Sequence, residues 1–174
     1  EGDQRDFGNL ANFNITPSNE WLDSKWRYTY QGIFRCNLAI ARIPDAPITA
    51  GQKEILVAEA KFLRAVYYFE LVKNWGGVPL LTEPISVSEA NLERSTEAEI
   101  WAQIEKDLTE AKEFLPMKSE VSASNVGRAT KGAASAYLAR AAIFQKKYDD
   151  AQSWANDVIT SGQYNLNDPF SKVW

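Results

Sequence analysis

Apolar residues recur at helical spacing along most of the chain, and turn-forming residues separate these periodic stretches. The spacing predicts five helices, over 20–43, 49–75, 96–115, 130–146 and 148–161. Pro44 follows the first helix, and Gly76 with Gly77 follows the second, which is the chemistry expected at helix C-termini. Thr49 with Gln52, and Thr96 with Glu99, fit capping boxes at two of the N-termini. No convincing strand pattern is present, so we predict an all-α chain.

The helix predicted over 49–75 carries two adjacent apolar stripes. The first stripe contains Ala58, Phe62, Ala65, Phe69 and Val72. The second contains Leu56, Ala60, Leu63, Tyr67 and Leu71. A simple surface helix needs only one stripe, so we expect neighbours to cover this helix from more than one side, as in a stacked array.

The helix predicted over 130–146 is built from small residues. Eight of the eleven residues in 132–142 are Gly, Ala or Ser, which lets two helix axes approach closely. Ile143 and Phe144 at its end are also expected to be buried. Between the helices we predict an extended loop over 78–91 and a flexible, serine-containing connector over 117–126.

A weak internal repeat relates two of these helices. A shift of 75 residues aligns Phe62 with Tyr137 and Phe69 with Phe144, on the predicted buried stripes. The last two helices also fit a degenerate tetratricopeptide hairpin, in which Ala139, Ala151 and Ala155 would occupy the positions where the helices cross. We therefore predict stacked helix hairpins of tetratricopeptide-repeat type, pairing 49–75 with 96–115 and 130–146 with 148–161.

Composition removes several classes of chemistry. The chain has 174 residues and a net charge of −4, which fits one domain or one piece of a larger one and disfavours a nucleic-acid binder. It contains no histidine, so histidine-dependent catalysis and imidazole metal sites are excluded. Cys36 is the only cysteine and cannot form an intrachain disulfide. We expect no cofactor and no bound metal.

Four segments of the chain carry a recognisable pattern. The most specific is AEAKFLRAVYYFELVKNWGGVPLL at 58–81. The others are the pattern of Trp26, Tyr30, Ile33, Asn37 and Ile40, the sequence GRATKGAA at 127–134, and the segment 148–166. In these segments, which together cover most of the chain, the sequence resembles the SusD/RagB family, the glycan-binding outer-membrane lipoproteins of Bacteroidetes, and all four occur in the family's order.

The resemblance implies a fold, a function and partners. Such proteins are all-α, with four tetratricopeptide-like hairpins that support a loop-rich half. They are held at the cell surface by a lipidated N-terminal cysteine, act as a lid on a SusC-like TonB-dependent transporter, and capture oligosaccharides or, in some members, peptides. They are not enzymes. Cys36 lies within a predicted helix and cannot stand in for the lipid-bearing cysteine.

The chain departs from the family in extent. It lacks the lipid segment and everything beyond the second hairpin, so we expect membrane contact only through an anchor outside this sequence. We interpret 1–174 as a single N-terminal domain fragment. Its parts are a loop region at 1–19, the helix 20–43, a first hairpin with an inserted loop at 49–115, and a second hairpin at 130–161.

Ligand-contacting residues are sought among the aromatic and polar side chains. Six tryptophans could stack on sugar rings, but Trp101 and Trp154 lie on amphipathic helices and are more simply explained as core residues. The better candidates precede the first helix: Gln4, Arg5 and Phe7, whose alternative role is loop packing. No carboxylate pair or nucleophile motif supports an enzyme. A tetratricopeptide-type peptide-binding adaptor remains the alternative function.

Overall fold

The computed structural model describes residues 5–86, 89 and 91–166, and within these ranges it contains helices and no strand. The helices are α1 (Arg5–Ala11), α2 (Glu20–Arg42), α3 (Ala50–Trp75), α4 (Glu97–Phe114), α5 (Lys131–Phe144) and α6 (Tyr148–Thr160). The all-α class is therefore confirmed. The five predicted helices all form, and their ends agree closely with the observed ones.

The predicted helix ends have the expected hydrogen bonds. Thr96 Oγ1 accepts from the Glu99 backbone N–H at 3.3 Å, and the Glu99 carboxylate accepts from the Thr96 N–H at 2.7 Å. Thr49 and Gln52 form the same reciprocal pair at the start of α3. Gly76 ends α3 with a φ of 67°, a conformation that side chains disfavour, which is why glycine stands there.

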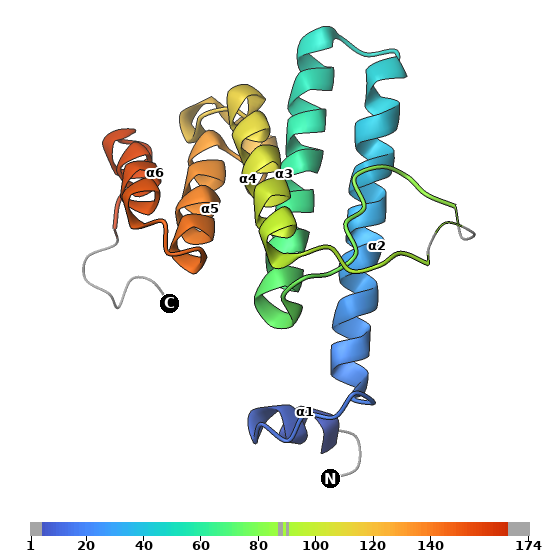
Figure 1. Ribbon diagram of the computed structural model, residues 1–174. Helices are drawn as coiled ribbons and strands as arrows, with labels where there is room; N and C mark the ends of the chain where they lie inside the picture. The colour runs from blue at the N-terminus through green and yellow to red at the C-terminus, as the bar shows by residue number, and fades with distance from the viewer. Residues whose placement is uncertain (1–4, 87–88, 90, 167–174) are drawn as a thin grey trace.

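The helices α2 to α6 form a row in which each packs against the next in sequence (Figure 1). α3 and α4 form one antiparallel hairpin and α5 and α6 another, as predicted. The repeat places equivalent residues of the two hairpins in contact. The ring centroids of Phe62 and Tyr137 lie 5.6 Å apart, and those of Phe69 and Phe144 lie 5.2 Å apart.

The core lies along α3, which is covered on both sides by α2 and α4. All five residues of its first stripe are buried, as predicted. The second stripe is only partly buried, because Leu63 is 46% exposed. The predicted burial of Ile143 and Phe144 is wrong: they are 55% and 51% exposed. Phe144 packs against Phe69 and Trp101, at centroid distances of 5.2 and 5.8 Å, and about half of its surface stays exposed.

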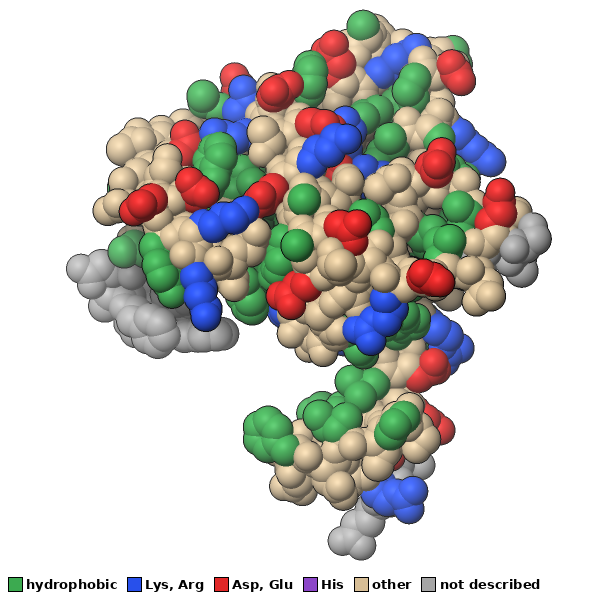
Figure 2. All heavy atoms as spheres, in the orientation of Figure 1, with side chains coloured by type: hydrophobic (Ala, Val, Ile, Leu, Met, Phe, Trp, Pro, Cys, Tyr) green, Lys and Arg blue, Asp and Glu red, His purple; other side chains and the backbone are tan. Residues whose placement is uncertain are grey.

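The segment 1–19, predicted to be a loop region, contains the seven-residue helix α1. Tertiary contacts fasten α1 to the start of α2: the Glu20 N–H donates to Asp6 Oδ2 at 3.0 Å, and Asn19 Nδ2 donates to the Asp6 carbonyl at 2.9 Å. Figure 2 shows this end of the molecule projecting as a lobe with hydrophobic side chains on its surface. The connector 117–126 also contains two short 3-10 turns, Lys118–Glu120 and Ala123–Asn125.

Candidate functional site

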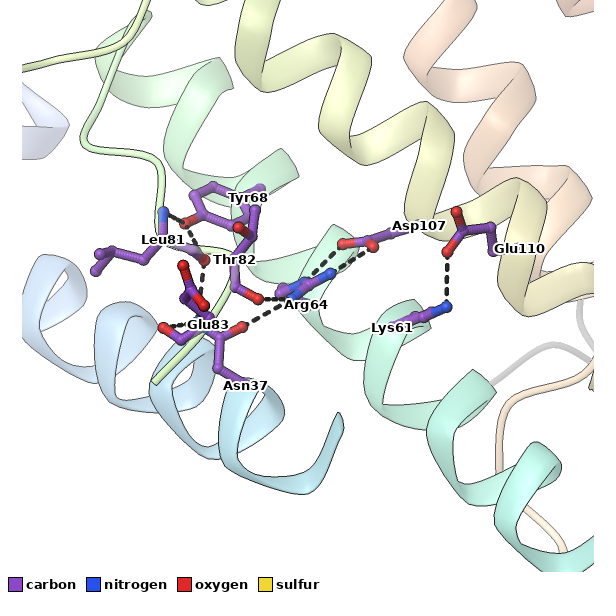
Figure 3. Close-up of polar contacts among 9 residues, drawn as sticks. All are labelled: Asn37, Lys61, Arg64, Tyr68, Leu81, Thr82, Glu83, Asp107 and Glu110. Carbon is purple, nitrogen blue, oxygen red and sulfur yellow. Dashed lines mark hydrogen bonds and ion pairs between the residues drawn. The ribbon is translucent and has the colours of Figure 1, made fainter. Parts of the chain in front are cut away.

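An extended segment, residues 78–84, crosses α2 and α3 and is here called the strap (Figures 1 and 3). The Val78 carbonyl accepts from the Ser95 backbone N–H at 3.0 Å, whereas the carbonyls of residues 79 and 81–83 accept from side chains. Tyr30 donates to the Pro79 carbonyl at 2.8 Å, and Tyr68 donates to the Leu81 carbonyl at 3.0 Å. The Leu81 N–H donates back to Tyr68 at 2.6 Å, so both backbone groups of that residue are satisfied by one hydroxyl.

Two further side chains complete the hold on the strap. Asn37 Nδ2 donates to the Leu81 and Glu83 carbonyls at 3.0 and 3.1 Å. Arg64 Nη1 donates to the Thr82 carbonyl at 2.7 Å and to Asn37 Oδ1 at 2.8 Å. The strap is therefore fixed to α2 and α3 through a continuous set of hydrogen bonds.

A buried ion pair supports this network from α4. Arg64 Nε and Nη2 donate to the two carboxylate oxygens of Asp107 at 2.8 and 2.7 Å, and the two side chains are only 5% and 1% exposed. Burial opposes the charged form of Arg64. The hydrogen bond and negative charge of Asp107 outweigh it, so the pKa of the guanidinium is raised. Burial also raises the pKa of Tyr68 to about 12, so its hydroxyl stays protonated and donates to the strap at neutral pH.

Beside the strap, one face of α2 forms an open hollow of about 680 Å³, here called the α2 hollow. The residues that line it are Trp26, Arg27, Tyr30, Gln31, Phe34, Arg35 and Leu38. They lie on one side of the helix because their spacing follows the helical repeat. Trp26 is held in place by Tyr30, at a centroid distance of 4.9 Å, and by Trp75, at 5.4 Å.

The chemistry of the α2 hollow suits a ligand with an apolar face and several hydroxyl groups. Phe34 is 43% exposed and offers a ring for dispersion contacts. Within the part of the chain that the structure describes, the side chains of Gln31 and Arg35 have no hydrogen-bond or ion-pair partner. Arg27 is paired with Asp23 at 2.8 Å. The hollow thus combines aromatic rings with unoccupied hydrogen-bonding groups.

The structure does not join the predicted ligand residues to this hollow. Gln4 lies outside the described residues, Arg5 is exposed at the start of α1, and Phe7 is 56% exposed with its ring 5.8 Å from Trp21. Trp21 and Trp26 are five positions apart, about 140° around the helix, so α1 and the hollow lie on different sides of α2. Whether Arg5 and Phe7 contact a ligand remains a prediction.

Sequence reasoning did not select Gln31, Phe34 or Arg35. The signal was present, since Trp26, Tyr30 and Phe34 recur every four residues, but this spacing also describes an ordinary core stripe. In the structure Trp26 and Tyr30 are partly buried against the core, whereas Phe34 is 43% exposed, so only part of this stripe belongs to the core.

The alanines predicted at the helix crossing, and Cys36, do not line the α2 hollow. Ala139 and Ala151 are 8% and 7% exposed, and Ala155 is partly exposed, so their role at a helix crossing stays a prediction. Cys36 is buried, and burial raises the pKa of its thiol to about 11.

Across the described ranges, no three histidine, cysteine or acidic side chains converge as metal ligands would. Nor is any helix there both long and apolar enough to pass through a bilayer.

Comparison with known proteins points to one family. A profile of the SusD-like family described as "Starch-binding associating with outer membrane" matches residues 6–143. A SusD-like protein of Formosa agariphila is 32% identical over 168 residues, covering 95% of this chain and 32% of the relative.

Solved structures agree. A laminarin-binding SusD-like protein superposes with a TM-score of 0.90 at 35% identity, covering 99% of this chain and 38% of that one. Surface glycan-binding protein A from Bacteroides fluxus gives a TM-score of 0.85 at 32% identity, covering 99% of this chain and 37% of that one. The chain therefore spans about a third of the length of these relatives.

Proposed function

We propose a function from one premise: the chain belongs to the SusD-like family, whose members are described as starch-binding and associated with the outer membrane. The full-length protein binds a glycan at the cell surface and carries out no reaction on it. The α2 hollow is the part of this chain that contacts the glycan. Laminarin is the first glycan to test, because the relative with a TM-score of 0.90 is described as laminarin-binding.

The observation that carries this proposal is the composition of the α2 hollow. An exposed ring beside unpaired donors is what a sugar requires, since the C–H face of a pyranose packs on an aromatic ring while its hydroxyls need hydrogen-bond partners. The ring and the donors come from successive turns of one rigid helix. Little conformational freedom is therefore lost when a ligand binds.

The strap gives the hollow a fixed boundary. Tyr30 lines the hollow and also donates to the Pro79 carbonyl at 2.8 Å, so the strap and the hollow share a side chain. The buried pair of Arg64 and Asp107 affects the hollow indirectly, because it holds the strap in place. These two residues position the site without touching a ligand.

Calorimetry on the full-length protein tests the site. We expect Phe34→Ala combined with Arg35→Ala to weaken laminarin binding by at least tenfold, because a stacking contact and a charged donor are both lost. Tyr28→Ala is the matched control: Tyr28 is an exposed aromatic residue of α2, 69% accessible, and does not line the hollow. Equal affinities for the double variant and the control would reject the α2 hollow as the site. Starch oligosaccharides are titrated in parallel.

The N-terminal candidates need a separate variant. Gln4→Ala, Arg5→Ala and Phe7→Ala are combined in one full-length protein and titrated with the same glycans. A loss of affinity would extend the site to α1, whereas an unchanged value would leave Phe7 with only its packing against Trp21.

Delivery to a transporter is the second part of the proposal. The full-length protein is held at the outer membrane by an N-terminal lipid and passes the glycan to a SusC-like TonB-dependent barrel. The family's described association with the outer membrane supports this location. Affinity purification from solubilised membranes of the source organism tests it: a TonB-dependent barrel should be recovered with the protein, and its absence would contradict the partnership.

A further inference from the structure

A second hollow lies between α4 and α6, beside the N-terminal end of α5. Its volume is about 430 Å³, within the range of sites that hold small molecules. A cavity of about 240 Å³ adjoins it, and both are lined by Trp154. We call the larger hollow the α4–α6 groove; the smaller cavity, which Glu105 and Asp150 also line, is not part of it. The α2 hollow lies at the opposite end of the row of helices (Figure 1), so the two sites are separate.

One wall of the α4–α6 groove is the ring of Tyr164, and several contacts fix its position. Its hydroxyl lies 2.7 Å from Thr130 Oγ1. The ring lies so close to Gly132 that a Cβ there would come within 2.3 Å of it, so only glycine leaves room. The neighbouring Gln163 accepts a hydrogen bond from the Ser119 N–H at 2.9 Å. This wall is therefore formed before any ligand arrives.

The other wall is the indole of Trp154, which is partly exposed. Lys112 Nζ lies 4.8 Å from the centre of its ring and 2.8 Å from Asp157 Oδ2. Among the residues that the structure describes, no acceptor is bonded to the Trp154 indole N–H. The groove thus offers two aromatic surfaces and a donor that faces no protein partner.

The lining of this groove carries a small excess of positive charge, three lysines against two carboxylates, although the chain as a whole carries −4. Lys118 Nζ lies 5.1 Å from the centre of the Tyr164 ring, and Lys131 lines the groove from the first turn of α5. Neither ammonium group has an ion-pair partner in the described part of the chain. Once Lys112 is paired with Asp157, these two cations face only one other lining carboxylate, that of Glu113.

We propose that the α4–α6 groove binds an acidic sugar unit, one whose ring carries a carboxylate or a sulfate group. The aromatic walls accept the apolar face of the ring, the indole N–H donates to a hydroxyl, and Lys118 with Lys131 bind the anion. This proposal rests on the proposed glycan-binding function but concerns a site of its own. It makes the protein a receptor with two subsites of different charge preference.

Calorimetry on the full-length protein, with three trisaccharides, tests this site. The probes are trigalacturonate, a sulfated maltotriose and neutral maltotriose. We expect at least one acidic trisaccharide to bind, and Lys118→Met combined with Lys131→Met to weaken it about tenfold or more, since methionine keeps the stem and removes the charge. The carboxylated and sulfated probes identify which anion the groove prefers.

Matched variants separate this site from the α2 hollow. Lys106→Met removes one charge from the exposed side of α4 outside the groove, and we expect it to leave the affinity within twofold. Phe34→Ala should weaken laminarin and leave the acidic trisaccharide unchanged. The groove proposal is overturned if neither acidic probe binds, or if the double lysine variant binds it as tightly as the natural protein. An acidic probe that responds only to Phe34→Ala would overturn the groove and support the α2 hollow.

Discussion

The buried pair of Arg64 and Asp107 gives the sharpest stability prediction. Asp107→Leu would leave the guanidinium, in a residue 4% exposed, with two N–H groups that have lost their acceptor. Breaking a buried ion pair by removing one partner costs about 3–5 kcal/mol, because the remaining charge is left uncompensated. Arg64→Met should cost a similar amount, since it strands the Asp107 carboxylate and also removes the donor to the Thr82 carbonyl.

Removing both partners should cost no more than removing one. Replacing a whole buried pair by apolar residues is often close to neutral, so Arg64→Met with Asp107→Leu leaves mainly the lost donors to Asn37 and Thr82. Each acceptor that loses its partner costs about 1–3 kcal/mol when it stays away from water. We therefore expect the double variant to lose less free energy of unfolding than the sum of the losses of the two single variants.

Urea unfolding of the full-length protein, followed by tryptophan fluorescence, measures these values, and an unchanged m-value checks that the comparison is valid. Hydrogen exchange at the Leu81 amide, which donates to Tyr68 at 2.6 Å, reports on the strap itself and should accelerate in both single variants. Lys61→Met is the control: the Lys61–Glu110 pair is partly exposed and should be worth less than about 1 kcal/mol. Single losses below 1 kcal/mol, or strictly additive ones, would refute the reasoning.

Three further outcomes are expected. The Cys36 thiol is buried with a pKa of about 11, so only about one thiol in a thousand is ionised at pH 8 and a disulfide reagent should react only after unfolding. Ala139→Leu and Ala151→Leu should each lower the free energy of unfolding by about 1–3 kcal/mol, because these small buried positions cannot accept a larger side chain. A hydrogen bond from Lys112 lowers the pKa of Asp157 in the folded protein. The ionised carboxylate therefore stabilises the fold fully above the pKa of an unfolded aspartate, about 3.9, and this contribution is lost as the pH falls through the lower pKa of the folded state. The stability difference between the natural protein and Asp157→Asn should therefore shrink in acid.

Each of these predictions has a control variant or a result that would contradict it. Ala136→Leu makes the same substitution on the exposed side of α5 and should be almost neutral, so a loss equal to that of Ala139→Leu would argue against the packing explanation. Rapid modification of Cys36 in the folded protein would show that its surroundings open readily. A stability difference for Asp157→Asn that stays constant from pH 6 to pH 2 would show that the carboxylate gains nothing from Lys112.

The helices and their ends could be predicted because the signals are local. Apolar periodicity gave five helices, and short-range pairs such as Thr96 with Glu99 marked their starts. The helix α1 was missed because seven residues are too few to show a period. Its position depends on contacts with Asn19 and Glu20, which the sequence pattern does not reveal.

The candidate sites could not be predicted because they depend on which faces of the helices remain uncovered. The spacing of Trp26, Tyr30 and Phe34 is the same whether a neighbour packs on them or a hollow is left. The strap network likewise joins residues far apart in sequence, as Arg64 and Asp107 are separated by 43 positions. Only the packing order of α2, α3 and α4 brings these groups together.

The way the strap is held has a consequence for how its sequence can vary. Its carbonyl oxygens, which every amino acid possesses, accept hydrogen bonds from the side chains of Tyr30, Asn37, Arg64 and Tyr68. The exposed side chains of Thr82 and Glu83 can therefore be exchanged while the course of the chain stays the same. Leu80 and Leu81 are more restricted, because both are partly buried against the core and proline at 81 would also remove the N–H used by Tyr68. The chemistry of this surface can in this way change while the backbone keeps its position.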